Sequence, residues 1–565
     1  MKAALGVSYG HHESSACLLC ADGSWEVVRE EALSRIRGDH RFPIRSIEYL
    51  LASRSISRRE IEVVCLHEKP LRNWLAHGFI KGQSPEHYLL KAQHLRHGNL
   101  SFQSLAKRWL GTPASRVHYS SHYASHYLTA RAFLDNEQPH LALILDGYGE
   151  GLSGALFFGE GGEWEMLETF SVQQSLGLLY SALTSWVGYT SNSDEHKVMA
   201  LSAYGEPRFY DLIRESVIVN EGSSFSVSSR FFNFEDYAQD AFTPEFCRVF
   251  GGPQAKKVLE DLGSKQARHV ANVVASFQKV IEAVVCELAE RMLEKYPRAE
   301  TLLLGGGLFL NVKLVSELFE RVHRRVLVSP TPGDAGSSIG AASFASDLLG
   351  WPFRVASSAF CGPVLQSLSG FPHLFQPFKV VDQSGLMLER LNDGQVCAVF
   401  QGRAECGPRS LGVRSLLCSI EKPEHIRRLN QVVKRREQFR PIAPMLMNPV
   451  TTPSSCSIRS RFEIGRWMGT LFEPTALLTN DFERFHHVMH ADGSMRTQIV
   501  TDQDVMDGAF HSSLETLLDS GMILANTSLN IAGDPTVLTP LDLYVNLRRL
   551  GIAEVFADDT VYKVQ

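Results

Sequence analysis

The clearest hydrophobic periodicity along the chain lies in Ala267–Tyr296, where apolar residues recur at intervals of three and four. This spacing predicts one long amphipathic helix. A short apolar strand, Glu300–Leu304, and a run of three glycines follow it. A second turn rich in glycine and serine, Ser329–Gly340, leads into a helix of small residues. The order strand, glycine turn, helix directs backbone N–H groups toward a phosphate.

Two other stretches share one pattern of apolar and polar positions. Ala4–Glu30 and Leu141–Glu168 each predict an apolar strand, a loop of small and polar residues, a second strand, a turn with glycine and a third strand. A tryptophan, Trp25 or Trp164, follows each turn. Such a repeat indicates two similar lobes. Actin-like and sugar-kinase-like ATPases present phosphate loops from hairpins of this kind, although two unrelated hairpins would give the same pattern.

The periodicity weakens in Ser357–Gln383, which is rich in serine, proline and glycine and predicts a connection between domains. A second domain is expected to open near Leu386. It contains a buried strand at Gln395–Gln401, a strand and polar turn at Met522–Pro535, and a closing helix at Pro540–Arg549.

Composition indicates an ordinary globular protein. The chain has 565 residues, 44% hydrophobic and 21% charged, with a formal net charge of −6, so two or more domains are expected. No secretory signal or membrane span is predicted. Cys17 and Cys20 lie in an apolar strand and are interpreted as core thiols rather than a redox pair. We therefore expect a cytoplasmic protein with no nucleic-acid or membrane partner, and the oligomeric state stays open.

Against this acidic background, one segment concentrates positive charge. Between Gln401 and Pro441 the cations are Arg403, Arg409, Arg414, Lys434, Arg435, Arg436 and Arg440. Glycine and proline space several of them, rather than helical intervals, and a buried strand leads into the segment. An unpaired cation is costly to desolvate, and Arg guanidinium groups bind phosphate and carboxylate oxygens in pairs. The segment predicts an anion site, the alternative being a solvated basic face.

A second group of residues has the chemistry of a metal site. His122 and His126 lie four apart in a stretch of helical character, His118–Phe133, so both rings share one face. Asp146 ends an apolar strand and Asp334 lies in a glycine turn. Two imidazoles and two carboxylates suit Fe(II), Mn(II) or Zn(II). The spacing H-x-x-x-H alone is also common in structural helices.

Two further residues are candidates for the same region. His12, in the first hairpin loop beside His11 and Glu13, is a candidate general base, or an exposed loop histidine. Lys197 follows an acidic run and could bind phosphate or cap a helix.

Taken together, these motifs resemble the NodU/CmcH-type O-carbamoyltransferase family. The resemblance extends over nearly the whole chain and is carried by the following segments: HHESSA, SHYASH, ILDGYGEG, SLGLLYS, DEHKVMALSAYG, LLLGGGLFLN, SPTPGDAGSSIGAA, QGRAECGPRSLGVRS, FRPIAP, HADGSMRTQ and NTSLN.

This resemblance implies an α/β fold with a two-lobed actin-like (ASKHA) domain, residues 1–360, similar to the tRNA threonylcarbamoyl-transfer proteins. A YrdC-like α/β domain, residues 361–565, is expected to follow. The implied activity is ATP-dependent O-carbamoyl transfer. The second domain would convert carbamoyl phosphate and ATP, with Mg²⁺, into carbamoyl-adenylate. The first, holding Fe(II) or another divalent metal, would transfer the carbamoyl group to a hydroxyl of a small natural product.

The resemblance also assigns residues. It places the metal on His122, His126, Asp146 and Asp334, and the base on His12. In the second domain it places the anion contacts on Arg409, Lys434, Arg440, Arg496, Asn526 and Ser528, of which Arg409, Lys434 and Arg440 are expected to be catalytic. Further expected contacts to substrate or nucleotide are Arg37, Lys197, Gly306, Gly307, Asn311 and Arg403. Two positions depart from the family pattern: a frequent lysine falls on Arg37, and the usual Gly-Gly-Val is Gly306-Gly307-Leu308 here.

Two other functions fit parts of the sequence. An actin-like sugar kinase or ATPase with a regulatory domain explains the repeat and the glycine turns, but not the cations or the histidine pair. An RNA-modifying relative of the threonylcarbamoyl system is disfavoured by the acidity. The acceptor itself is not predicted, and loops such as Leu71–Gln103 and Arg230–Gln254 are candidates for its recognition.

Overall fold

The computed structural model describes residues 1–70, 72, 102–135, 137–221, 224–234, 241–437, 440, 442–447, 456–473, 482–501, 504, 512–557 and 560–565. The chain forms two compact units. Unit 1 comprises Met1–Trp25 and His40–Ala356, and unit 2 comprises Glu26–Asp39 and Ser357–Gln565. The break after Ala356 lies near the predicted boundary at residue 360. Unit 2 also includes a short early segment that the sequence placed in the first domain. Most of the predicted loop Leu71–Gln103 lies outside the described residues.

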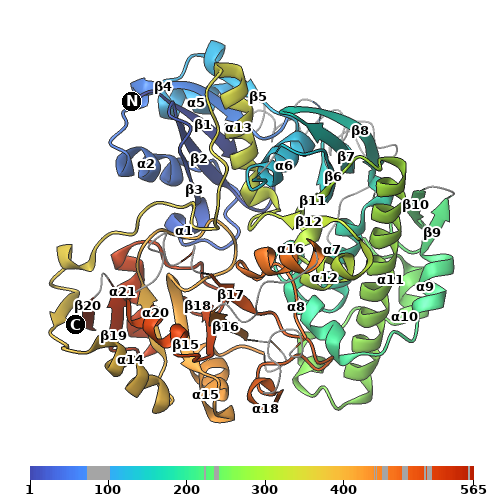
Figure 1. Cartoon of the computed structure of the whole chain (residues 1–565). Helices are drawn as coiled ribbons and strands as arrows, with labels where there is room; N and C mark the ends of the chain where they lie inside the picture. Colours follow the sequence, from blue (N-terminus) through green and yellow to red (C-terminus); the bar gives the residue numbers. More distant parts are fainter. Residues whose placement is uncertain are drawn as a thin grey trace. The chain divides into compact units, whose positions relative to one another are not determined.

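Unit 1 is built on two five-stranded sheets with the same strand order (Figure 1). Each has an antiparallel three-stranded meander followed by two parallel strands. The first sheet contains β1(Ala3–Ser8), β2(Ser15–Cys20), β3(Trp25–Arg29), β4(Ile61–Leu66) and β5(Val117–Tyr119), in the order β3-β2-β1-β4-β5. The residues of β3 after Trp25 belong to the early segment counted with unit 2. The second contains β6(His140–Gly149), β7(Leu152–Glu160), β8(Glu163–Ser171), β11(Thr301–Gly305) and β12(Arg325–Val328), in the order β8-β7-β6-β11-β12. The repeat confirms the two-lobed α/β architecture.

Helices and one small hairpin complete unit 1. They are α2(Ile44–Ser53), α5(Phe102–Leu110), α6(His122–Arg131), α7(Leu176–Trp186), α8(Glu195–Leu201), α9(Tyr210–Ser216), β9(Ile218–Glu221), β10(Ser224–Val227), α10(Pro244–Phe250), α11(Lys265–Lys295), α12(Val312–Arg321) and α13(Ser337–Leu349).

The long predicted helix is confirmed as α11, which Ser264 caps through the backbone N–H of Ala267. By length and composition α11 passes a test for a membrane-crossing helix, but 78% of its most apolar window is buried inside the fold. Its apolar stripe, including Val270, Val273 and Phe277, is fully buried. The helix α11 is therefore a core helix of unit 1.

The small-residue helix α13 packs against α6 and β1 at very short range (Figure 1). A Cβ atom added to Gly340 would lie 1.9 Å from the carbonyl oxygen of Ser125 on α6. A Cβ on Gly6 of β1 would lie 2.0 Å from the carbonyl oxygen of Ser338. The small residues therefore permit the close packing that fixes the position of α6 and its histidines.

Unit 2 is built on an eight-stranded mixed sheet with the order β13-β20-β19-β14-β15-β18-β16-β17. Its strands are β13(Phe375–Phe378), β14(Cys397–Phe400), β15(Arg414–Ser419), β16(Ala443–Met447), β17(Gln498–Val500), β18(Leu524–Ser528), β19(Glu554–Ala557) and β20(Thr560–Val564). Its helices include α1(Glu30–Ser34), α14(Gln383–Asn392), α15(Pro423–Arg427), α16(Cys456–Gly465), α20(Ser512–Asp519) and α21(Pro540–Leu550). The predicted closing helix is α21, but a hairpin, β19 and β20, follows it.

Candidate metal and anion sites

The four predicted metal ligands lie together in unit 1. His122, His126, Asp146 and Asp334 are all buried, and each offers a ligand atom within 4.8 Å of the others. His122 Nε2 lies 3.3 Å from Asp146 Oδ2 and 3.2 Å from His126 Nε2. His126 Nε2 lies 3.2 Å from Asp334 Oδ1. Two imidazole nitrogens and two carboxylates facing one centre form a mixed N/O set for a divalent transition-metal ion.

Local structure explains how the ligands reach this centre. The helix α6 begins at His122 because Ser121 caps it through the backbone N–H of Ala124, and one helical turn separates the two histidines. Asp146 lies near the end of β6, in the lobe that repeats the first hairpin. Asp334 lies in a short 3₁₀ turn just before α13.

Neighbouring backbone groups orient the ligands. His126 Nδ1 donates to the Pro332 carbonyl at 3.0 Å, which leaves Nε2 free to face the centre. Asp146 Oδ1 accepts the Gly307 N–H at 2.7 Å. Gly306 has φ of 92°, a conformation that favours glycine. The two glycines predicted to contact nucleotide therefore position a candidate metal ligand in this structure.

The charges of the cluster also fit a bound cation. Burial alone would raise the pKa of Asp146, and Asp334 adds to this, but hydrogen bonds with His122 and His126 hold it below its ordinary value. Burial would lower the pKa of His126, yet the two carboxylates raise it to about 10. Asp334 Oδ1 and His122 Nδ1 are buried without a hydrogen-bond partner among the described residues. A metal ion would replace the imidazolium proton as the counter-charge and engage the unsatisfied oxygen.

His12 lies next to this cluster. Its Nε2 is 3.4 Å from Asp334 Oδ2, and its side chain is 39% exposed. Glu195, on α8, is close enough for His12 to lower its pKa, against a larger rise caused by burial. The position therefore suits a group that reaches both the cluster and solvent.

Lys197 also lies on α8, two residues after Glu195. Its Nζ pairs with Asp194 at 3.3 Å and lies 5.0 Å from the Tyr189 ring centroid. Asn311 is the N-cap of α12 and exchanges hydrogen bonds with Gln278. The contacts of Asn311 are those of a capping residue inside unit 1.

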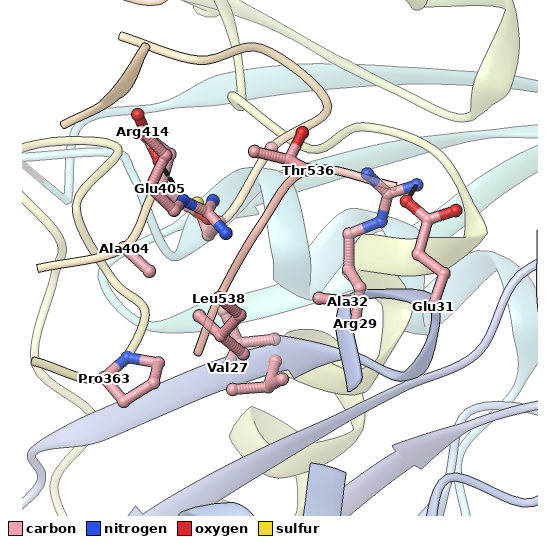
Figure 2. Close-up of a pocket in the computed structure, with 13 residues that line it drawn as sticks. Val27, Arg29, Glu31, Ala32, Pro363, Ala404, Glu405, Arg414, Thr536 and Leu538 are labelled. Carbon is pink, nitrogen blue, oxygen red and sulfur yellow. Dashed lines mark hydrogen bonds and ion pairs between the residues drawn. The ribbon is translucent and has the colours of Figure 1, made fainter. Parts of the chain in front are cut away.

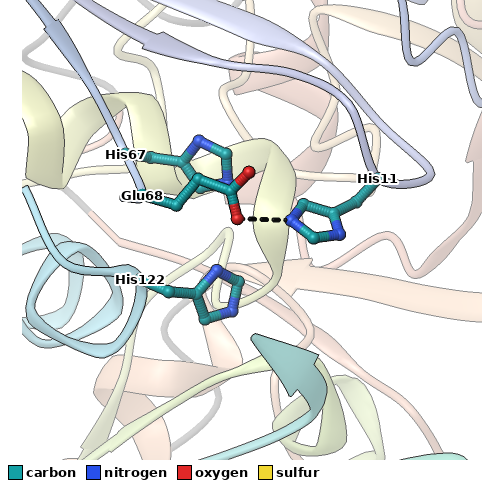
Figure 3. A group of neighbouring side chains, drawn as sticks. All are labelled: His11, His67, Glu68 and His122. Carbon is teal, nitrogen blue, oxygen red and sulfur yellow. Dashed lines mark hydrogen bonds and ion pairs between the residues drawn. The ribbon is translucent and has the colours of Figure 1, made fainter. Parts of the chain in front are cut away.

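The sequence interpretation did not include a second group beside the first. His11, His67 and Glu68 approach His122, again with ligand atoms within 4.8 Å of one another (Figure 3). His67 and Glu68 directly follow the buried strand β4. The sequence did contain a signal for this group. In the segment LHEKP, residues 66–70, a histidine and a glutamate follow an apolar strand that could pair with the first strand of the chain.

The predicted anion site lies in unit 2, where the described structure brings five cations together. Arg409, Arg436, Arg440 and Arg496 are half-buried and Lys434 is 4% exposed. Burial, followed by the charge of Arg440, lowers the pKa of Arg409 to about 10 and that of Arg436 to about 9. Burial and the three neighbouring arginines hold the pKa of Arg496 far below its ordinary value. Mutual repulsion of this kind predicts an anion among these cations.

The topology of the sheet explains why distant segments meet here. Arg409 lies in the loop from β14 to β15, Arg440 precedes β16, and Arg496 precedes β17. Asn526 and Ser528 lie on β18, which pairs with β15 and β16. Neighbouring strands of one sheet thus supply every element of the cluster.

Polar neighbours hold parts of this cluster in place. Lys434 Nζ donates to the carbonyl oxygens of Ser528 and Asn530, each at 2.7 Å. Asn526 donates to Ser410 O at 2.9 Å and Gln498 Oε1 at 2.6 Å, while its own buried Oδ1 has no partner among the described residues. Arg496 Nε is likewise buried without a hydrogen-bond partner in this part of the chain.

Three arginines that the sequence proposed as anion or nucleotide contacts lie outside the cationic cluster. Arg403 pairs with the buried Glu26 at 2.9 Å and donates to the Phe360 carbonyl. Arg414 is paired with Glu405 at 2.6 Å. Arg37 is exposed and belongs to the short early segment of unit 2. Arg403 and Arg414 thus make contacts of structural ion pairs.

Unit 2 also contains a pocket bounded by thirteen residues, with the Arg414–Glu405 pair on one side and Arg29 and Glu31 on another (Figure 2). Val27, Ala404 and Leu538 contribute apolar surface to it. None of the cationic cluster residues lines it, so the pocket is separate from the predicted anion site.

Comparison with known proteins identifies the family to which this chain belongs. The family described as carbamoyltransferase N-terminus matches residues 3–343, and carbamoyltransferase C-terminus matches residues 388–563. The chain therefore belongs to the carbamoyltransferase family, and it is a carbamoyltransferase enzyme of the NodU/CmcH type, as the sequence predicted.

The chain is similar to several named proteins. The nodulation protein NolNO of Sinorhizobium fredii is 28% identical over 93% of this chain and 75% of its own length. The 3'-hydroxymethylcephem-O-carbamoyltransferase of Streptomyces clavuligerus is 29% identical over 52% of this chain and 56% of its own length. Among solved structures, HypF in its phosphate- and nucleotide-bound form covers 62% of this chain and 47% of that chain, with 14% identity and a TM-score of 0.34.

Proposed function

We propose that this enzyme is an ATP-dependent O-carbamoyltransferase that uses carbamoyl phosphate, forms carbamoyl-adenylate in unit 2 and transfers the carbamoyl group in unit 1 to a hydroxyl of a small natural product. The observation that carries the proposal is the presence of two chemically different sites in one carbamoyltransferase chain. One is a cluster of mutually repelling cations, and the other is a buried histidine–aspartate group.

The cationic cluster suits adenylate formation. Carbamoyl phosphate and ATP together bring many negative oxygens, and arginines bind them as bidentate donors. Hydrolytic release of phosphate consumes one water and leaves carbamate, whose oxygen attacks the α-phosphorus of ATP and displaces pyrophosphate. Arg409, Arg440 and Arg496 would stabilise the charge that develops on the leaving pyrophosphate, and Mg²⁺ would accompany the nucleotide. Lys434 is held by carbonyl oxygens at the edge of the same cluster.

The histidine–aspartate group suits the transfer step. His122, His126, Asp146 and Asp334 would hold Fe(II) or another divalent ion, which would act as a Lewis acid toward the carbamoyl carbonyl and the AMP leaving group. The acceptor hydroxyl is a weak nucleophile, so its proton must be removed as its oxygen attacks the carbamoyl carbon. His12 would take that proton; its distance of 3.4 Å from Asp334 and its partial exposure to solvent support this role. The bond between the carbamoyl carbon and the phosphate oxygen then breaks, and AMP leaves with its electron pair.

Product analysis tests the proposal. The enzyme, carbamoyl phosphate, ATP and Mg²⁺ are incubated with candidate hydroxyl acceptors, including the hydroxymethyl cephem class named for the Streptomyces relative. We expect AMP, phosphate and pyrophosphate, with a mass gain of one carbamoyl group on the correct acceptor. Release of ADP, or carbamoyl transfer without ATP consumption, would contradict the adenylate route.

A further inference from the structure

We propose that His11, His67, Glu68 and His122 form a second metal-binding site, next to the predicted first one and sharing His122 with it. The site would bind a divalent transition-metal ion through three imidazoles and one carboxylate. It goes beyond the proposed function, since carbamoyl transfer as described above uses one ion in unit 1.

The arrangement of the three rings is the first argument. The ring centroids of His11, His67 and His122 lie 5.7 Å apart in all three pairs. With metal–nitrogen distances of about 2.0–2.1 Å and tetrahedral or trigonal angles, three imidazoles on one ion have centroids about 5–5.5 Å apart. Glu68 lies among these rings, and its Oε2 is 2.8 Å from His11 Nε2 (Figure 3). Only a small inward movement would complete the coordination.

The second argument is the set of unused nitrogens. His67 is fully buried, and neither of its ring nitrogens has a hydrogen-bond partner among the described residues. Buried polar atoms are normally satisfied, so such an imidazole requires an explanation.

The third argument concerns the shared histidine. His122 Nε2 faces Asp146 and His126 in the first group, whereas its Nδ1 is buried and unpaired among the same described residues. Opposite nitrogens of one imidazole can bind two ions when the ring loses its proton to solvent. Two divalent ions would then be neutralised by the imidazolate and by the carboxylates of Asp146, Asp334 and Glu68, as buried charges require.

Hydrogen bonds to one carboxylate connect the backbone segments that carry the two groups of ligands. Glu150 is buried, and its Oε1 accepts the backbone N–H of His122 at 2.9 Å and that of Lys69 at 2.8 Å. One carboxylate thus joins the start of α6 to the segment that carries His67 and Glu68. The ligands of the second site are therefore positioned before any ion binds. Three nitrogens and one oxygen favour Zn(II), Fe(II) or Co(II) over Mg²⁺ or Ca²⁺.

Titration of the chelator-treated full-length protein with Co(II) tests the proposal, followed by visible ligand-field absorption and metal analysis after gel filtration. We expect two ions per chain in the wild type. His67→Ala should retain one, because only the second site loses a ligand, and His126→Ala should also retain one, with a different spectrum. His122→Ala should retain neither tightly. His269→Ala, on α11, is the matched control and should bind two.

Circular dichroism establishes that each variant is folded, and His67→Gln provides a second variant that changes the ring with less loss of volume. The wild-type stoichiometry alone is decisive even if a variant fails to fold. One Co(II) per wild-type chain would overturn the proposal. So would a folded His67 variant that binds two ions with the wild-type spectrum.

Discussion

At the scale of single residues, the two candidate sites share buried polar atoms that no described residue satisfies. Asp334 Oδ1 and Arg496 Nε are buried atoms without hydrogen bonds in the described parts of units 1 and 2. Leaving such groups unsatisfied costs free energy. The imbalance has opposite sign in the two units: the first offers carboxylates and imidazoles to a cation, and the second offers guanidinium groups to an anion.

The first prediction concerns Gly307, whose N–H holds Asp146. A Cβ at this position would lie 2.7 Å from Asp146 Oδ1, so Gly307→Ala should displace that carboxylate. We expect metal affinity to fall by about 10–100-fold, the usual effect of disturbing a group that orients a ligand. Gly252→Ala is the control, because nothing lies within 4 Å of its added Cβ. Equilibrium dialysis measures both, and equal affinities would show that Asp146 does not bind the ion.

The second prediction concerns His12. If His12 removes the acceptor proton, His12→Ala should slow carbamoyl transfer by roughly 10²–10⁴-fold. Metal content and ATP–pyrophosphate exchange should stay at wild-type levels, because neither uses this ring. Rapid-quench measurement of the transfer step provides the test. Wild-type transfer in a variant that has lost the imidazole would exclude His12 as the base.

The third prediction concerns Arg496. Replacing the half-buried Arg496 with an apolar side chain of similar length removes its repulsion from Arg409, Arg436 and Arg440. Arg496→Met should therefore raise the thermal unfolding midpoint of the anion-free protein. It should also reduce the further rise that added pyrophosphate produces by binding the folded state. Differential scanning fluorimetry with and without pyrophosphate measures both, and a midpoint rise with pyrophosphate as large as that of the wild type would contradict the anion role.

At the scale of secondary-structure elements, small residues bring the ligand-bearing helix to its place. Helices α6 and α13 approach so closely that Gly340 has no room for a side chain. Gly340→Ala should destabilise unit 1 by about 1–3 kcal/mol or more, as overpacking does, and should weaken metal binding by moving α6. Leu348→Ala, at a 46% exposed position of the same helix, should change stability little. Urea unfolding followed by circular dichroism compares the two variants, and a Gly340→Ala protein as stable as Leu348→Ala would contradict the packing argument.

Periodicity predicted those elements whose neighbours in sequence determine them. The helix α11, the repeated hairpins and the strand–turn–helix around Asp334 follow from patterns of a few residues. The three-residue strand β5 was missed because its partner, β4, lies about fifty residues away in sequence. The final hairpin of β19 and β20 was also missed, because strands of four and five residues carry too little periodicity to predict.

The same distinction explains what the sequence could predict of the sites. His122 and His126 share a helical face, and the motifs of the family assigned the two aspartates, so this group was found. His67 and Glu68 come from a parallel strand whose partner, β1, is about sixty residues away, and no local pattern joins them to His122. The density of positive charge alone could not show that Arg409 joins the cationic cluster while Arg403 forms an ion pair. The partner of Arg403 is Glu26, which is distant in sequence.

At the scale of the whole molecule, the proposed reaction is divided between two units. A mixed anhydride is easily lost to water, so an enzyme gains from forming and consuming it within one chain. The division is the central claim, because it assigns separate chemistry to the cationic cluster of unit 2 and to the histidine–aspartate group of unit 1.

The most direct test measures carbamoyl-phosphate-dependent ATP–pyrophosphate exchange and carbamoyl transfer side by side on Arg440→Ala and Asp334→Ala. Loss of a charge-assisted contact worth roughly 1.5–3 kcal/mol should lower exchange in Arg440→Ala by about tenfold or more, with transfer falling in parallel. Asp334→Ala should keep wild-type exchange and lose transfer, while Arg427→Ala, at an exposed position of α15, should change neither. Exchange that is abolished in Asp334→Ala but intact in Arg440→Ala would contradict the account, because adenylate formation would then belong to unit 1.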